Sequence, residues 1–142
     1  MFMKKKRILV VDDHADNLEW LTVALSDKYQ VSGCASGEQA LRSLEQVKPD
    51  LLVLDVRMGP IDGVQCLEAI RDRSGYADIP AVALTALAGE VTKAELLAAG
   101  FQAVVEKPIL DERELHDAID SLLLLAMYKK DEPAPFGETS AA

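Results

Sequence analysis

Short runs of purely apolar residues alternate along this chain with longer segments in which apolar residues recur every three or four positions. Residues 8–11 and 51–54 contain only Ile, Leu and Val, with no alternating polar position. An uninterrupted apolar run of this length predicts a strand that is buried on both faces, as in a parallel sheet covered by helices. The strands are expected at residues 7–11, 29–35, 50–54, 81–84 and 102–106.

The segments between these strands have the periodicity of amphipathic helices. In the first of them, three Leu residues form one apolar stripe. Ser36, followed three residues later by Gln39, predicts a helix-capping box, and Gly100 is suited to the left-handed residue that ends a helix. We expect helices at about residues 15–27, from 36 to before 49, from about 64 to before 74, at 90–99, and from about 111 onward.

Strands that alternate with helices imply a parallel sheet joined by right-handed crossovers. The expected fold is therefore an α/β domain of three layers, a doubly wound (βα)5 arrangement with helices on both faces of the sheet. One domain is expected over residues 1–128. Residues 129–142 are rich in Pro, Ala and small polar residues, and they are expected to form a disordered tail.

Charge and composition limit the classes of partner. The 142 residues carry a formal net charge of -9, which disfavours direct nucleic-acid binding because that binding depends on cationic side chains. The basic run at residues 4–7 is interpreted as a solvated cap on the first strand. No apolar segment is long enough for a signal peptide or a membrane span, and the two isolated Cys residues suggest reduced thiols. We expect a cytoplasmic protein without membrane insertion.

Polar residues capable of chemistry follow four of the five predicted strands. They are, in chain order, Asp12, Asp13, Asp55, Thr85 and Lys107. The carboxyl ends of parallel strands meet at one edge of a sheet, and ligands bind at that edge in open α/β folds. Three carboxylates gathered there would repel one another unless a cation is present, and oxygen ligands of this kind suit Mg²⁺. A lysine and a hydroxyl add the positive charge and the hydrogen-bond donor needed to stabilise a phosphoryl group during its transfer.

Asp55, on the central strand, is the natural nucleophile of such a site, because carboxylates can form acyl phosphates. Each residue taken singly has a simpler structural interpretation. A lone Asp at the end of a strand is usually a turn or helix-capping residue, and Thr85 or Lys107 could be an ordinary strand or surface residue. The joint occurrence of these residues at the ends of four strands favours the functional interpretation.

Four short segments make the sequence resemble one known family. They are ILVVDD at residues 8–13, LLVLDVRMGPIDG at 51–63, ALTA at 83–86 and EKP at 106–108. In this order and spacing they are similar to the receiver (phosphoacceptor) domain of two-component response regulators, over about residues 7–125. The resemblance implies a flavodoxin-like sheet with strand order 2-1-3-4-5, in which the first and third strands are neighbours.

The resemblance also implies roles at the acidic site. Asp55 would accept a phosphoryl group from a phosphohistidine on a sensor histidine kinase or a histidine phosphotransfer protein. Asp13, Asp55 and the backbone carbonyl of Arg57 would bind Mg²⁺, or Mn²⁺ in its place. Asp12 would act mainly through a bound water. The chain would be a phosphorelay signalling protein that assists its own phosphorylation and dephosphorylation, and not an enzyme.

The same resemblance implies how the signal leaves the site. Lys107 would pair with the phosphoryl group, and Thr85 would move to hydrogen-bond it, coupling the site to a face formed by the fourth helix, the fifth strand and the fifth helix. A downstream protein target would bind this face. The peptide bond between Lys107 and Pro108 is expected to be cis. Val104 occupies the position where the family usually has an aromatic switch residue, so we expect a smaller conformational change. With no output domain after the last predicted helix, a stand-alone receiver is expected.

Three other functions remain open at this point. A phosphohydrolase of the haloacid dehalogenase type also uses an Asp nucleophile on a parallel sheet, but it needs a second Asp two residues later, where this chain has Arg57. A receiver-like interaction module that does not accept phosphate is favoured only by Val104. A flavodoxin-like cofactor carrier is disfavoured, because the first strand leads into acidic residues and not into a phosphate-binding glycine loop.

Several residues near these motifs are given structural roles. His14 is interpreted as a surface-loop residue and not as a metal ligand, and His116 as a solvated residue of the last helix. Trp20 lies off the leucine stripe of the first helix, where it either packs partially or marks a surface for docking a kinase. Cys34 and Cys66 are expected to fill the core.

Overall fold

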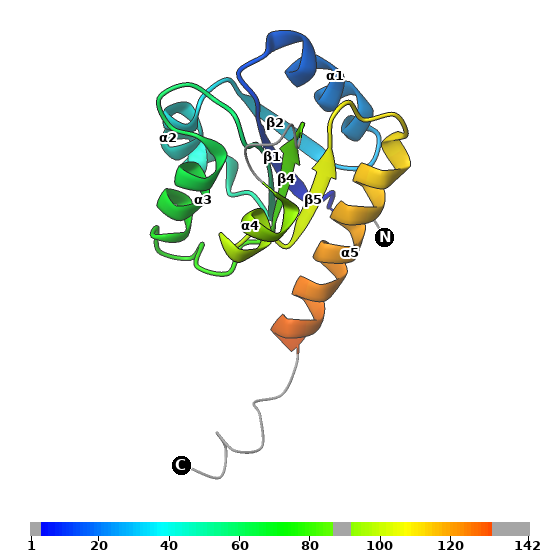
Figure 1. Ribbon diagram of the computed structural model, residues 1–142. Coiled ribbons are helices and arrows are strands. Elements are labelled where there is room, and N and C mark those ends of the chain that lie inside the picture. Colours follow the sequence, from blue (N-terminus) through cyan, green and yellow to red (C-terminus); the bar gives the residue numbers. More distant parts are fainter. Residues whose placement is uncertain (1–3, 87–91, 132–142) are drawn as a thin grey trace.

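Five parallel strands form one sheet in the order β2-β1-β3-β4-β5. The computed structural model describes residues 4–86 and 92–131 (Figure 1). The strands are β1 (Arg7–Val11), β2 (Gln30–Cys34), β3 (Leu51–Asp55), β4 (Ala81–Thr85) and β5 (Ala103–Glu106). The predicted fold class and strand order are both confirmed.

Helices cover both faces of this sheet (Figure 1). They are α1 (Ala15–Ser26), α2 (Gly37–Val47), α3 (Gly63–Arg71), α4 (Lys93–Ala98) and α5 (Glu112–Asp131). Apolar residues of α1 and α5 form one core with the sheet, and those of α2, α3 and α4 form another on the opposite face. In β1, Ile8 and Val10 belong to the first core, whereas Leu9 and Val11 belong to the second. The apolar run is unbroken because both faces of the strand are buried.

The helix cap predicted at Ser36 is present in a modified form. The Ser36 hydroxyl accepts a hydrogen bond from the N–H of Gln39 at 3.1 Å, but the Gln39 side chain accepts from the N–H of Ala35 and not from that of Ser36. A complete capping box lies one helix later, where Asp62 and Gln65 exchange hydrogen bonds at the start of α3. Both caps fix the start of a helix beside the carboxyl edge of the sheet.

The end of α5 differs from the prediction. The helix continues to Asp131, past residue 129 where the tail is predicted to begin, and residues 132–142 lie outside the described part of the chain. The helix can continue because no helix-breaking residue occurs before Pro133. Within residues 4–86 and 92–131, no helix is both long and apolar enough to cross a membrane.

The short helix α4 follows the predicted pattern at its end more closely than at its start. Thr92 caps it by accepting a hydrogen bond from the N–H of Glu95, and the predicted positions 90 and 91 lie outside the described residues. Gly100 follows the helix with a φ of 115°. That conformation favours glycine, as its place in the sequence predicted.

His116 of α5 is half-buried, and the prediction that it would be solvated is wrong. Its Nε2 lies 3.1 Å from the carbonyl oxygen of Ala24 in α1, and its ring stacks on that of Tyr29 with 6.0 Å between the ring centroids. The sequence of α5 alone could not predict this contact, because only folding of the sheet brings α1 beside α5. Cys34 and Cys66 are buried, as predicted.

Candidate functional site at the carboxyl edge of the sheet

The carboxyl ends of four strands bring the predicted site residues together. In the parallel pairing, Val11 of β1 lies opposite Leu54 of β3, so the residues that follow them, Asp12 and Asp55, are neighbours across the same edge. The backbone N–H of Lys107 donates to the carbonyl oxygen of Thr85 at 2.7 Å, which holds the ends of β4 and β5 together. This edge includes the switch point between β1 and β3, where an open α/β sheet leaves a crevice.

Two carboxylates of the site are removed from solvent. Asp12 and Asp55 are 0% and 3% exposed, and with Thr85 they are the buried polar residues of the described chain. Lys107 contacts both: its Nζ lies 3.3 Å from Oδ2 of Asp12 and 3.2 Å from Oδ1 of Asp55. The N–H of Arg57 also donates to Oδ1 of Asp55, at 3.3 Å. A single ammonium therefore faces two buried carboxylates, and the centre of the site keeps excess negative charge.

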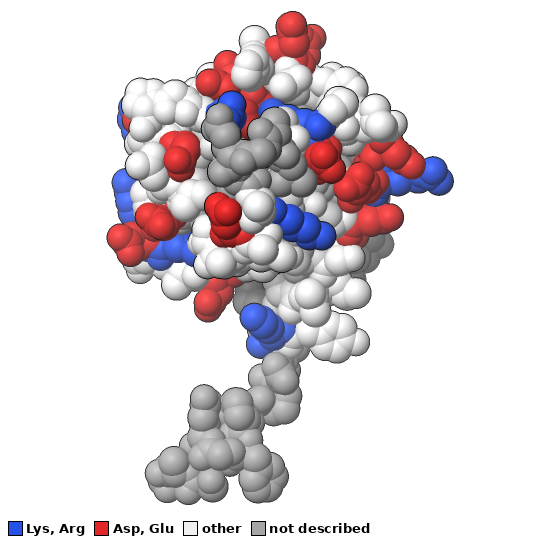
Figure 2. Space-filling model, viewed as in Figure 1, with Lys and Arg blue, Asp and Glu red and all other residues white. Residues whose placement is uncertain are grey.

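This excess charge appears in the pKa of Asp55. Burial raises the pKa of Asp55 above its ordinary value, the Lys107 ammonium acts in the opposite direction, and the negative charge of Asp12 raises it further. The net direction is upward. Folding therefore holds Asp55 as a carboxylate that would be more stable with an additional cation nearby. Elsewhere, Figure 2 shows acidic and basic side chains interspersed over one face of the molecule.

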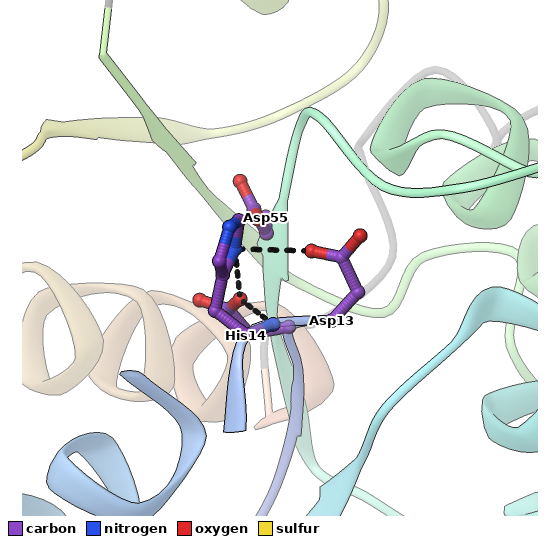
Figure 3. A group of neighbouring side chains, drawn as sticks. Asp13, His14 and Asp55 are labelled. Carbon is purple, nitrogen blue, oxygen red and sulfur yellow. Dashed lines mark hydrogen bonds and ion pairs between the residues drawn. The ribbon is translucent and has the colours of Figure 1, made fainter. Parts of the chain in front are cut away.

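Asp13 and His14 complete the acidic cluster on its solvent side (Figure 3). The Nδ1 of His14 lies 3.2 Å from Oδ1 of Asp13 and 3.5 Å from Oδ1 of Asp12. Ligand atoms of Asp12, Asp13, His14 and Asp55 all lie within 4.8 Å of one another. Three carboxylates this close, one of them with a raised pKa, fit a hard divalent cation that binds through oxygen.

Gly63 is a site residue that sequence reasoning treated only as part of a turn. A Cβ built on Gly63 would lie 2.5 Å from the carbonyl oxygen of Asp55 and 2.8 Å from the Cα of Val56. Its own N–H donates to the carbonyl oxygen of Val56 at 2.9 Å. The start of α3 therefore packs directly on the backbone that carries Asp55, and only a residue without a side chain fits there.

The remaining predicted residues surround this centre. Arg57 is exposed in the loop after Asp55, and the Lys107–Pro108 peptide bond is cis, the isomer that the resemblance implied. Val104 of β5 is half-buried and packs against the core on the α2–α4 face. It occupies the predicted switch position, but its side chain has no ring.

A groove of about 390 Å³ opens beside Asp12 and Lys107. It is lined by residues of α1, of the ends of β1, β4 and β5, and of the β5–α5 loop: Asp12, Asn17, Trp20, Leu21, Leu84, Ala86, Lys107, Pro108 and Ile109. Trp20 is 43% exposed, and it is the single Trp of the chain. Trp20 therefore lines the groove with part of its side chain exposed to solvent.

Comparison with known proteins agrees with this fold. The family model of the response regulator receiver domain matches residues 8–120. The chain belongs to this family, a family of signalling domains in phosphorelays and not a classical enzyme family.

Individual relatives show the same relationship. The chain is 36% identical over 123 residues to the signal transduction histidine-protein kinase BarA of Escherichia coli strain K12, and the match covers 86% of this chain but only 13% of BarA. Its structure resembles the chemotaxis protein CheY4 of Vibrio cholerae, with a TM-score of 0.76, 26% identity and coverage of 83% and 98% of the two chains. It also resembles the receiver domain of the sensor histidine kinase PA1611 of Pseudomonas aeruginosa, with a TM-score of 0.75, 29% identity and coverage of 84% and 98%. That receiver holds a magnesium ion in its active-site cleft.

Proposed function

We propose that this chain accepts a phosphoryl group on Asp55 from a phosphohistidine of a partner protein. The observation that carries the proposal is the placement of Asp55. It ends the central strand β3, is 3% exposed, and has the Lys107 ammonium 3.2 Å from its carboxylate. A nucleophilic carboxylate beside a fixed positive charge is the arrangement that phosphoryl transfer to a side chain requires.

In the proposed step, a carboxylate oxygen of Asp55 forms a bond to phosphorus while the phosphorus–nitrogen bond of the phosphohistidine breaks. The electron pair leaves on the imidazole nitrogen, which takes up a proton from solvent. Lys107 stabilises the negative charge on the phosphoryl oxygens, and the backbone hydrogen bond from Lys107 to Thr85 keeps the lysine in place. Hydrolysis of the acyl phosphate by water would reset the chain.

The acidic cluster supports a divalent cation as the cofactor of this step. We propose that Asp13 and Asp55, with the backbone carbonyl of Arg57, hold Mg²⁺ or Mn²⁺, and that Asp12 acts through a bound water. The cation would neutralise charge on the transferring phosphoryl group. The magnesium ion reported in the PA1611 receiver, at 29% identity, supports this assignment.

The groove beside the site supports a protein as phosphoryl donor. It is lined by Trp20 of α1, by Pro108 and Ile109 of the β5–α5 loop, and by Asp12 and Lys107 of the acidic site. Asp55 does not line the groove itself but lies 3.2 Å from Lys107, which does, so a histidine of a partner bound here would lie near the phosphoacceptor. We propose that a sensor histidine kinase or a histidine phosphotransfer protein binds here, and the match to part of the kinase BarA supports this class of partner.

The signal would leave through the face formed by α4, β5 and α5, where a protein target would bind. We propose that the change on this face is small, because Val104 has no aromatic ring to rotate. NMR spectra recorded with and without beryllofluoride would test this, and large shifts throughout α4 would contradict it. A phosphorylation-independent interaction module is the second candidate, and the same aliphatic residue is the observation that favours it.

The test of the proposed function is intact mass after incubation with acetyl phosphate, with and without Mg²⁺, for the wild type and Asp55→Ala. We expect an adduct that depends on Mg²⁺, resists acid, is released by base and is absent from the variant. Should no adduct appear, beryllofluoride binding separates rapid hydrolysis from an inactive site. Failure of both would favour the interaction module.

A further inference from the structure

His14 immediately precedes α1, but its side chain does not cap this helix. It is the N-terminal cap residue of α1, yet its side chain makes no capping hydrogen bond. Ser, Thr, Asp and Asn cap helices well because their side-chain oxygens accept from the first free N–H groups. The imidazole of His14 is turned instead toward the acidic cluster, where Figure 3 shows it facing Asp13.

Two contacts fix this orientation. The backbone N–H of His14 donates to Oδ1 of the buried Asp12 at 2.9 Å, which anchors the residue at the edge of the site. The ring Nδ1 then lies 3.2 Å from Asp13 and 3.5 Å from Asp12. The pairing itself contributes little to folding, because the His14 side chain is 70% exposed and exposed ion pairs are weak.

The spacing suits a shared ion. The His14 nitrogen belongs to the group of ligand atoms that lie within 4.8 Å of one another, together with oxygens of Asp12, Asp13 and Asp55. Ligands on one transition-metal ion at about 2.1 Å are at most about 4.2 Å apart. Asp13 and His14 are exposed, so their side chains have room to rotate toward a shared ion.

We propose that His14 is an additional nitrogen ligand of this metal site, and that it makes the site prefer Zn²⁺ and similar transition-metal ions over Mg²⁺. The inference rests on the proposed function, because it assumes that the acidic cluster binds a cation. Mg²⁺ binds oxygen ligands almost exclusively, whereas imidazole is a favoured ligand of Zn²⁺, Ni²⁺ and Cu²⁺. The thiols of Cys34 and Cys66, which would otherwise attract Zn²⁺, are buried.

Titration calorimetry of the full chain with Zn²⁺ and, separately, with Mg²⁺ tests the proposal. The variants are His14→Phe, which keeps a planar ring without a donor, and His116→Gln, which removes the other His of the chain. For His14→Phe we expect an approximately tenfold loss of Zn²⁺ affinity with less than about twofold change for Mg²⁺. His116→Gln should bind both ions as the wild type does.

NMR provides a second measurement, which would show no difference between the two ions if His14 had only a structural role. The ¹⁵N resonance of His14 Nδ1 should shift much further on addition of Zn²⁺, which binds it directly, than on addition of Mg²⁺, which changes only its neighbour Asp13. In addition, His14→Asn should unfold at the same or a higher urea concentration than the wild type, because Asn is a good helix cap.

The outcomes separate this inference from the proposed function. The role of His14 would be overturned by equal Zn²⁺ affinity in the wild type and His14→Phe, or by an equal loss of affinity for Zn²⁺ and Mg²⁺ in the variant. Phosphorylation of Asp55 could still be observed with Mg²⁺ in either case. Absence of any divalent binding by the wild type, with no beryllofluoride adduct, would overturn both.

Discussion

Acidic side chains have different surroundings at the two edges of the parallel sheet. At the carboxyl edge, Asp12 and Asp55 are buried and share the ammonium of Lys107. Burial raises the pKa of Asp55, and Lys107 does not fully compensate for it. The Asp55 carboxylate is therefore less stable in the folded chain than it would be in water.

At the amino edge, acidic residues are partly exposed and have their own partners. Asp50 accepts a hydrogen bond from the backbone N–H of Arg7 at 2.8 Å, and the guanidinium lies 3.9 Å away. Asp120 of α5 is bonded by the side chains of Lys28 and Tyr29. Burial alone would raise the pKa of Asp120, but these two hydrogen bonds outweigh it, and the net direction is downward.

The difference between the edges indicates which one serves function. At the amino edge, Asp50 and Asp120 follow the usual solution for a stable protein, in which a carboxylate is solvated or paired. The carboxyl edge keeps charge that is incompletely paired, and sites of this kind are common where a protein binds ions or performs chemistry. Substitutions at the two edges should therefore separate stability from phosphorylation.

Replacing Lys107 should have the largest effect. Lys107→Met leaves Asp12 and Asp55 without a cation. We expect the free energy of unfolding to fall by about 3 kcal/mol, because a buried carboxylate is then left without an opposite charge. Formation of the acyl phosphate should slow by about a hundredfold. Urea unfolding and intact mass measure the two effects. Lys129→Met, at an exposed position of α5, is the control and should change neither.

Gly63→Ala tests the backbone contact beneath Asp55. The added Cβ would lie 2.5 Å from a backbone oxygen that cannot move freely, so we expect about 2 kcal/mol of destabilisation and slower phosphorylation. Gly59→Ala is the matched control in the loop just before α3, because a Cβ there meets nothing within 4 Å. Equal unfolding midpoints for the two variants would show that the backbone at Asp55 can shift to make room for a side chain at position 63.

Arg71→Met tests the amino edge without touching the site. The Arg71 guanidinium donates to the carbonyl oxygens of Gly100 and Ile79 and to the side chain of Gln102. Removing these bonds should lower the free energy of unfolding by about 2 kcal/mol, because partly buried acceptors lose their donors. The rate of phosphorylation below the unfolding transition should not change. A large loss of that rate would contradict the separation of the two edges.

Asp120→Asn should have the smallest effect and a defined pH dependence. The pKa of Asp120 is lowered in the folded chain, so its stabilising effect is present above the unfolded pKa and is lost as the pH falls through the folded pKa. Because the side chain is partly exposed, we expect a difference from the wild type of less than about 1 kcal/mol at pH 7. Urea unfolding at several pH values should show this difference shrinking below about pH 4. A difference that grows on acidification would contradict the pairing.

Much of the fold and the centre of the site could be predicted from the sequence. The apolar runs of β1 and β3 indicate strands buried on both faces, and parallel strands necessarily end at one edge. That rule places Asp12, Asp55 and Lys107 at the same edge of the sheet. The family resemblance adds the strand order and the cis bond at Pro108.

The remaining features depend on three-dimensional contacts that no local pattern contains. The requirement for Gly63 follows from the path of the β3–α3 loop over Asp55, and the partner of His116 comes from α1. The orientation of the His14 ring depends on a rotamer choice beside Asp13. The only available signal was that His is a poor helix cap at a position where Ser or Asp would be expected.

The most direct test of this account is the Mg²⁺ dependence of the free energy of unfolding for the wild type and Asp55→Asn. Without Mg²⁺, the variant should be more stable by about 1 kcal/mol, because it removes an incompletely paired buried charge. Added Mg²⁺ should stabilise the wild type more than the variant and narrow the difference. A variant that is less stable without Mg²⁺, or an identical response of both proteins to the ion, would contradict the view that the carboxyl edge holds Asp55 for a cation and a phosphoryl group.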